Sequence, residues 1–120
     1  MSEVSLADAA EAMASIWSPI DGGVTAPNGF EAAGVVVGLK PSGRPDLALI
    51  LAPDEAVCAG TFTTSVVRAA CVDLCAERLS SRDGRMRAVL INSGQANACT
   101  GDRGLLDSQR ATQAVADLSL

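Results

Sequence analysis

The sequence predicts an α+β fold in which helices pack on a mostly antiparallel sheet. Two apolar segments, residues 30–40 and 46–52, are separated by the five-residue stretch 41–45, which contains one Gly and two Pro. Two strands joined by a turn of this kind form an antiparallel hairpin. Apolar residues recur at helical spacing in the later segments 69–79 and 102–118, and we expect these to form helices that cover the sheet.

The N-terminal residues predict a separate amphipathic helix. It spans residues 5–17 and begins with a weak capping box at residues 5–8. One face of this helix would carry Leu6, Ala9, Ala10, Met13, Ile16 and Trp17. We expect residues 1–17 to be a helical extension of one domain that spans residues 18–120. The first part of that domain, 18–28, contains two Gly and two Pro and is expected to form a loop.

The rest of the chain completes the sheet and the helices. Residues 53–55, a Pro followed by two acidic residues, predict a turn, and residues 56–64 predict a third strand with a threonine-rich end. Residues 87–92 predict a fourth strand. The final helix, 102–118, has a stripe formed by Ala111, Ala114, Val115 and Leu118. No C-cap residue follows it, so we expect the chain to stop within this helix, as a truncated protein would.

Composition limits the kind of core that the chain can build. At 120 residues it is long enough for one domain, and 48% of its residues are hydrophobic. It has two Phe, one Trp and no Tyr, so Ala, Val and Leu must fill the core, and each buries less area than an aromatic residue does. Because only 19% of the residues are charged, we expect the chain to rely on surface supplied by something else, as a piece of a larger fold does.

The charge pattern argues against nucleic acid and membrane as partners. The net charge is −5, and the small basic cluster of Arg82, Arg85 and Arg87 is interrupted by Asp83. Without aromatic residues for stacking, this cluster fits a solvated turn better than a nucleic-acid site. No run reaches the roughly 18–20 apolar residues that span a bilayer, and the N-terminus lacks the layout of a signal peptide. We therefore expect a cytoplasmic protein.

The four cysteines are Cys58, Cys71, Cys75 and Cys99. Disulfides are rare in the cytoplasm. The spacing of Cys71 and Cys75 is not that of a zinc finger, and with no His in the chain a zinc site would need all four thiolates. Cys99 has no basic neighbour in the sequence that would activate it as a nucleophile. We therefore predict no metal site, and we interpret the cysteines as small buried hydrophobic residues.

The stretch Asn92–Gly101, with the sequence NSGQANACTG, lies between the fourth predicted strand and the last predicted helix. Small, amide and hydroxyl side chains suit a ligand-facing loop better than a core. Gly94 and Gly101 permit a positive φ or a close backbone approach. The following helix directs the positive end of its dipole at this loop. The stretch is therefore a candidate anion or oxyanion site, and an ordinary capped strand–helix turn is the alternative.

NSGQANACTG is similar to the NSGNANACTG signature of the ornithine acetyltransferases, the bifunctional glutamate N-acetyltransferases of arginine biosynthesis. Three further segments agree in the same order. Residues 22–30 (GGVTAPNGF) resemble the family's GGVTAPKGF, residues 33–49 resemble its AAGV…GIKKSGRPDLALI, and residues 59–70 resemble its GVFTTN-VKAAPV. The resemblance covers Trp17 to about Leu118, which is nearly the whole chain.

The resemblance implies a layered αββα fold of the N-terminal-nucleophile type. It implies an enzyme that moves acetyl from N-acetylornithine to glutamate by ping-pong chemistry, and some members also use acetyl-CoA as the donor. The family's nucleophile is a Thr far downstream, which self-cleavage exposes as the N-terminus of a β chain. The implied partner is therefore the remainder of the precursor, in an α/β hetero-oligomer. Thr100 and Gly101, which close the signature, would form the oxyanion hole, while Asn92 and Asn97 would hold the loop.

The chain departs from the family's pattern in sequence and in length. Gln95 replaces Asn, Asn28 and Pro41 each replace Lys, and Cys71 replaces Pro. The larger departure is that the nucleophile segment and the family's substrate-binding residues are not in this chain, so we expect these 120 residues alone to be inactive. Two alternatives stay open. The chain could be a non-catalytic truncated binding or assembly piece, or a relative of the N-terminal-nucleophile aminopeptidases.

Overall fold

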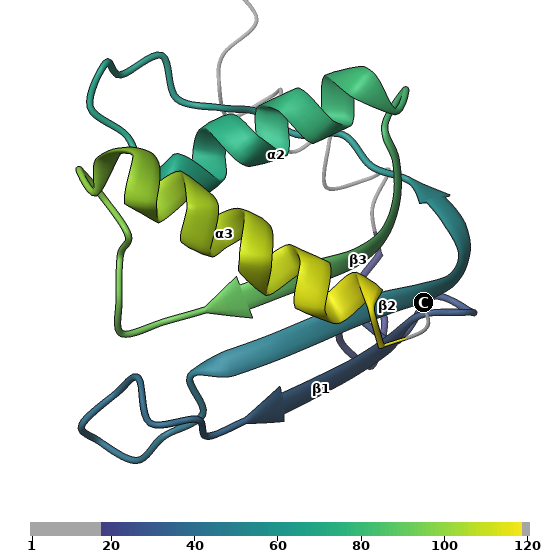
Figure 1. Cartoon of the computed structure of the whole chain (residues 1–120). Helices are drawn as coiled ribbons and strands as arrows, with labels where there is room; N and C mark the ends of the chain where they lie inside the picture. Colours follow the sequence, from purple (N-terminus) through teal and green to yellow (C-terminus); the bar gives the residue numbers. More distant parts are fainter. Residues whose placement is uncertain (1–17, 119–120) are drawn as a thin grey trace, which may run out of the picture.

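The computed structural model describes residues 18–118, which form an antiparallel sheet with two helices on one of its faces (Figure 1). The elements in chain order are β1 (Glu31–Val35), β2 (Leu47–Val57), α2 (Ala70–Ser81), β3 (Arg85–Asn92) and α3 (Gly101–Ala116). The three strands lie in the order β1-β2-β3. The α+β class and the antiparallel hairpin are confirmed. The predicted helix at residues 5–17 lies outside the described residues.

The register of the sheet separates a face covered by the helices from an open face. Leu49 of β2 is opposite Leu90 of β3, and Ile50 is opposite Val89. Leu90 lines a cavity together with residues of α2 and α3, so this face of the sheet lies under the helices. Val89 and Ile91 alternate with the covered positions and are 46% and 45% exposed. The open face of the sheet is therefore apolar and accessible.

The predicted turn at residues 53–55 and the third strand at 56–64 are wrong. Residues 47–57 form one strand. Its pairing with β3 is irregular between the pairs Leu51–Ala88 and Ala56–Met86, because these pairs are five residues apart in β2 and only two residues apart in β3. The extra residues of β2 form a bulge. A bulge accommodates a proline, because a residue there does not have to donate an N–H to the neighbouring strand. The strand ends at Val57, which pairs with Arg85, the first residue of β3. The next N–H, that of Cys58, bonds to the carbonyl oxygen of Gly84 at 2.7 Å, in the turn before β3.

The first strand is shorter than the predicted segment 30–40, and Asp46 is the reason. The Asp46 carboxylate accepts the backbone N–H of Val37 at 2.7 Å and that of Lys40 at 2.8 Å. These N–H groups bond to a side chain and leave the β ladder, so β1 ends at Val35. The Asp46 side chain is buried, with 3% of the residue exposed. The hydrogen bonds from Val37 and then Lys40 hold the pKa of this carboxyl below its usual range.

The helices meet the prediction closely, and they bury little apolar surface. α2 and α3 pack against each other, and Leu74 of α2 is 5% exposed. Among residues 18–52 and 56–118, Ala52 and Leu74 carry the only apolar side chains that are buried, and these residues are 8% and 5% exposed. α3 ends at Ala116 and is capped by the Asp117 N–H, so the expectation that the chain stops within this helix is wrong. Within the described range, no helix is both long and apolar enough to cross a membrane.

Several large apolar side chains stay accessible, which agrees with an expected reliance on surface from elsewhere. Val66 is 94% exposed, Val57 81%, Ile20 75% and Val67 69%. Val66 and Val67 belong to the segment between β2 and α2, where Ser65 makes local turn hydrogen bonds to Val67. Exposed apolar groups of this size and number mark a surface that another part of a protein covers.

The Asp46 carboxylate generates a prediction about acid stability. Its pKa is lowered in the folded state, so its stabilising contribution is fully present above the pKa of an ordinary aspartate and is lost as the pH falls through the lower folded-state pKa. We expect Asp46→Asn to lower the melting temperature at neutral pH and to flatten its decline in acid. Thermal unfolding between neutral and strongly acidic pH measures both effects.

The matched control for this measurement is Asp21→Asn, which changes an exposed aspartate in the loop before β1. This control should keep the melting temperature and the acid decline of the parent protein. An Asp46→Asn protein with the parent's acid decline would show that the hydrogen bonds to Val37 and Lys40 do not stabilise the fold through the ionised carboxylate.

Candidate functional site

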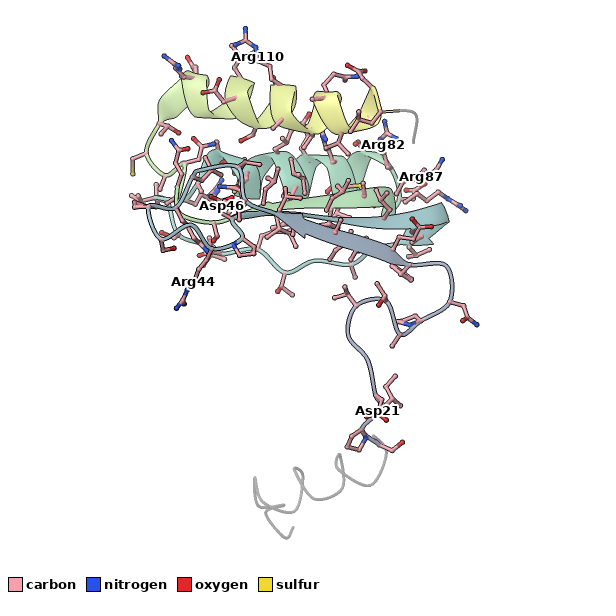
Figure 2. The ribbon with its side chains drawn as sticks, turned by 90° about the horizontal axis from the view of Figure 1, so that it is seen from below. Asp21, Arg44, Asp46, Arg82, Arg87 and Arg110 are labelled. Atoms are coloured by element: carbon pink, nitrogen blue, oxygen red, sulfur yellow. The ribbon has the colours of Figure 1, made fainter. Side chains whose placement is uncertain are left out.

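The signature stretch forms the loop between β3 and α3, as the sequence predicts. Its beginning is fixed by two hydrogen bonds. The Ser93 N–H donates to the carbonyl oxygen of Asp46 at 2.9 Å, and the Asn92 side-chain amide donates to the carbonyl oxygen of Gln95 at 3.0 Å. Asp46 lies among the ribbons near this loop, whereas the neighbouring Arg44 points away from them (Figure 2). Asp46, whose hydrogen bonds end β1, therefore also anchors the start of this loop.

Gly94 packs directly on the connection between β1 and β2. It has a φ of +100°, and a Cβ placed on it would lie 2.7 Å from Lys40 Cγ and 3.0 Å from the Leu39 carbonyl oxygen. Both the backbone conformation and the lack of space require glycine here. Lys40 is itself held, because its N–H bonds to Asp46 and its Nζ donates to the Pro45 carbonyl oxygen at 3.2 Å.

The second half of the loop has an alternating backbone conformation. Asn97, Cys99 and Gly101 have φ values of +47°, +57° and +59°, and Thr100 between the last two has φ −97° and ψ 0°. Alternation between left-handed and right-handed residues turns successive backbone N–H groups toward one concave side, a nest that favours anions. Ala98 forms a β-bridge with Ala69, which ties this half of the loop to the start of α2.

Thr100 and Gly101 lie where α3 begins. Thr100 makes no side-chain capping hydrogen bond to the helix, so the ordinary-cap alternative does not describe it. Its hydroxyl instead donates to the side-chain oxygen of Asn97 at 2.6 Å. A Cβ placed on Gly101 would meet no atom within 4 Å, so the backbone at this position faces open space. The hydroxyl and the Gly101 backbone therefore lie together at the positive end of a 16-residue helix.

Asn97 connects Thr100 to the body of α3. Its side-chain Nδ2 donates to the carbonyl oxygen of Gly104 at 3.0 Å and to Ser108 Oγ at 3.0 Å. Ser108 Oγ in turn donates to the Gly104 carbonyl oxygen at 2.9 Å. Asn92 and Asn97 thus both bond to the loop or to its helix, which is the holding role expected of them.

Gly104 is a site residue that the sequence prediction missed. It is buried, and a Cβ on it would overlap Thr100 Oγ1 and lie 2.5 Å from Asn97 Oδ1. Any larger residue would displace the hydroxyl that the loop presents. A signal for it exists in the sequence, because a glycine inside a helical pattern costs about 1 kcal/mol relative to alanine and usually has a packing reason.

A cavity of about 260 Å³ opens in front of Thr100 and Gly101. Its lining consists of Arg68, Ala70, Asp73, Cys99, Thr100, Gly101, Asp102 and Leu105. Arg68 Nε donates to Asp73 Oδ1 at 2.6 Å, and its Nη1 donates to the Ser65 carbonyl oxygen at 2.9 Å. Asp73 offsets the charge of Arg68, and Asp102 adds a second carboxylate to the lining. The N-terminal end of α3 and its backbone N–H groups are therefore the remaining source of positive potential at this wall.

The described residues offer stabilisation of negative charge rather than a nucleophile. Cys99 lines the cavity, but the chain has no His to act as its base. Burial, followed by the nearby Cys71, raises the pKa of the Cys75 thiol, which keeps this thiol protonated. All four cysteines are free, with Cys58 half-buried and Cys71, Cys75 and Cys99 exposed, so the prediction that they are buried hydrophobic residues is wrong. Between residues 18 and 118 no group of three or more His, Cys, Asp or Glu side chains is placed to hold a metal ion.

Comparison with known sequences identifies relatives of this chain. The model of the ArgJ family matches residues 31–119. The arginine biosynthesis bifunctional protein ArgJ of Parasynechococcus marenigrum is 74% identical over 106 residues, which are 88% of this chain and 26% of that protein. The protein of the same name from Prochlorococcus marinus (strain MIT 9313) is 70% identical over 105 residues, again 88% of this chain and 25% of the relative. The chain thus spans about a quarter of the length of these relatives.

Solved structures share the fold. The ornithine acetyltransferase of Mycobacterium tuberculosis, solved in complex with ornithine, superimposes with a TM-score of 0.73 at 46% identity, over 82% of this chain and 52% of that one. The ArgJ protein of Bacillus halodurans gives a TM-score of 0.70 at 39% identity, over 74% and 46% of the two chains. With its signature loop, its fold and its sequence in agreement, the chain belongs to the ArgJ family, the acetyltransferases of arginine biosynthesis.

Proposed function

We propose that this chain supplies the oxyanion-binding part of an acetyltransferase that transfers acetyl from N-acetylornithine to glutamate. One observation carries the proposal. Thr100 and Gly101 lie together at the N-terminus of α3, and both residues line the same cavity. Donors held in advance where negative charge develops are the largest single source of catalysis in acyl transfer.

The proposed reaction has two acyl-transfer steps. A nucleophilic Thr from the remaining sequence attacks the acetyl carbonyl of N-acetylornithine, ornithine leaves, and the acetyl group stays on the Thr oxygen. The amine of glutamate then attacks this ester and releases N-acetylglutamate. Each step passes through a tetrahedral intermediate with a negatively charged oxygen. Thr100 and Gly101 serve both steps, because the same carbonyl oxygen becomes the oxyanion each time.

The whole protein that the proposal describes is larger than this chain. Its other part would supply the nucleophilic Thr and the substrate-binding residues, as a β chain that pairs with this one in an α/β hetero-oligomer. The apolar open face of the sheet, with Val89 and Ile91 nearly half exposed, supports such a partner. We place the assembled enzyme in the cytoplasm and include acetyl-CoA as a second acetyl donor, on the family's pattern.

The same exposed surface favours a second candidate function, a non-catalytic assembly piece. In that case the chain would bind its partner through the open face of the sheet and would contribute no group to the reaction. The two functions differ in what happens when Thr100 is changed, because an assembly piece does not need this hydroxyl.

A chimeric enzyme provides the test. The 106 matched residues of the Parasynechococcus marenigrum relative are replaced by those of this chain, which gives a full-length protein that carries Thr100 and Gly101. We expect this chimera to transfer acetyl from N-acetylornithine to glutamate. We expect Thr100→Ala to lower kcat by about 10²–10³-fold with little change in KM, the usual loss for one oxyanion donor.

Thr112→Ala is the matched control for this substitution. It removes the same atoms from a threonine within α3, and the Thr112 hydroxyl bonds to the Ser108 and Gln109 carbonyl oxygens, away from the cavity. Its kcat should equal that of the unmodified chimera. A Thr100→Ala chimera with unchanged kcat would refute the oxyanion role and leave the assembly function.

A second prediction concerns the chain by itself. We expect the isolated 120 residues to show no acetyl transfer, because the described residues hold no nucleophile paired with a base. The assay follows the appearance of N-acetylglutamate, with the chimera as the positive control. Turnover by the isolated chain would mean that a nucleophile lies within it and that the proposed division of labour is wrong.

A further inference from the structure

We propose that Asn97 is a positioning residue that holds the Thr100 hydroxyl in place and keeps its proton until negative charge develops on the substrate. This inference rests on the proposed oxyanion role of Thr100. It is carried by the hydrogen bonds that link Asn97 to Thr100 on one side and to α3 on the other, and by the lack of space at Gly104.

The orientation of the Asn97 amide is fixed by α3. Nδ2 has two hydrogens, and both have acceptors, namely the Gly104 carbonyl oxygen and Ser108 Oγ, each at 3.0 Å. The opposite orientation would place Oδ1 against the Gly104 carbonyl oxygen, and two acceptors repel each other. Oδ1 therefore has to face Thr100, and the helix determines this.

Both hydrogen-bond acceptors of the Thr100 hydroxyl are oxygens of Asn97. Oγ1 lies 2.6 Å from Asn97 Oδ1 and 3.2 Å from the Asn97 carbonyl oxygen. The shorter bond has the better geometry for O–H···O. A hydroxyl has one proton, so while it points at Asn97 it cannot also point into the cavity.

Gly104 prevents the Thr100 oxygen from moving away when its proton turns. A Cβ at this position would overlap Oγ1 and lie 2.8 Å from Thr100 Cβ, which shows how closely the helix backbone approaches the side chain. The proton can turn by rotation about the Cβ–Oγ1 bond while the oxygen stays where it is. The site can therefore exchange one acceptor for another without a backbone movement.

This arrangement favours the transition state over the bound substrate. When the Thr100 hydroxyl turns from Asn97 Oδ1 to the neutral carbonyl oxygen of a bound substrate, one neutral acceptor replaces another. The substrate therefore gains little binding free energy from this hydrogen bond. For an oxyanion the new bond is charge-assisted and roughly twice as strong. The Thr100 proton is therefore given up only when negative charge appears, so the hydroxyl stabilises the transition state without tightening substrate binding.

The test measures kcat and KM in the chimera for Asn97→Ala and Asn97→Asp, each alone and together with Thr100→Ala. We expect Asn97→Ala to lower kcat about tenfold at constant KM, as a loss of orientation at one oxyanion donor would. We expect Asn97→Asp to lower it about 100-fold, because a carboxylate keeps the Thr100 proton through a charge-assisted bond and repels the oxyanion. A merely structural role of Asn97 predicts losses of kcat that persist when Thr100 is already Ala.

The double variants separate this inference from the proposed function. In the Thr100→Ala background we expect Asn97→Ala to leave kcat unchanged, because residues that act through one another are not additive. Independent, multiplying losses of kcat would overturn the positioning role of Asn97. If Thr100→Ala alone leaves kcat unchanged, the oxyanion role itself fails, which is a different result.

Two further variants complete the design. Ser108→Ala removes one of the two acceptors that hold the Asn97 amide, and it leaves the Asn97–Thr100 pair untouched, so it asks the same question if Asn97 variants do not fold. We expect it to lower kcat severalfold, and to have no effect when Thr100 is already Ala; equal losses in both backgrounds would refute the inference.

Asn28→Ala, at an exposed position before β1, is the matched control and should keep the parent kcat.

Discussion

The structure depends first on the buried carboxylate of Asp46. Its two oxygens accept the N–H groups of Val37 and Lys40, its own N–H bonds to Val35, and its carbonyl oxygen accepts the N–H of Ser93. One residue thereby ends β1, shapes the connection to β2 and fixes the start of the signature loop. A carboxylate with backbone donors on both oxygens is stable in a buried position because the charge is fully hydrogen-bonded.

The loop that begins at Ser93 is built by close packing as much as by hydrogen bonds. Gly94 meets the connection held by Asp46, and Gly104 meets Thr100 and Asn97 at the far end. Between these two contacts, Asn97, Cys99 and Gly101 have left-handed backbone conformations, which are typical of loops that turn N–H groups toward an anion, and α3 adds its positive end. Short side chains are therefore needed at both ends of the loop so that a rigid set of donors can face the cavity.

Much of this could be predicted from the sequence, because it follows from local patterns. The hairpin, both helices and a polar loop between a strand and a helix were predicted from periodicity and from turn residues, and the signature pointed to Thr100 and Gly101. What the sequence could not provide depends on contacts between distant residues. The strand predicted at 56–64 fails because β3 begins opposite Val57. Asp46 and Gly104 became visible as site residues only when the fold brought Val37, Ser93 and Thr100 to them.

The measurement that tests the central claim most directly is a crystal structure of the full-length chimera with a tetrahedral analogue of acetyl transfer. The account predicts that the charged oxygen of the analogue lies about 2.7–3.1 Å from both Thr100 Oγ1 and the Gly101 nitrogen, the range for an oxyanion and its donors. The Thr100 hydroxyl would then have turned from Asn97 toward the analogue. An analogue bound with its oxygen elsewhere, and with Thr100 still bonded to Asn97, would contradict the account.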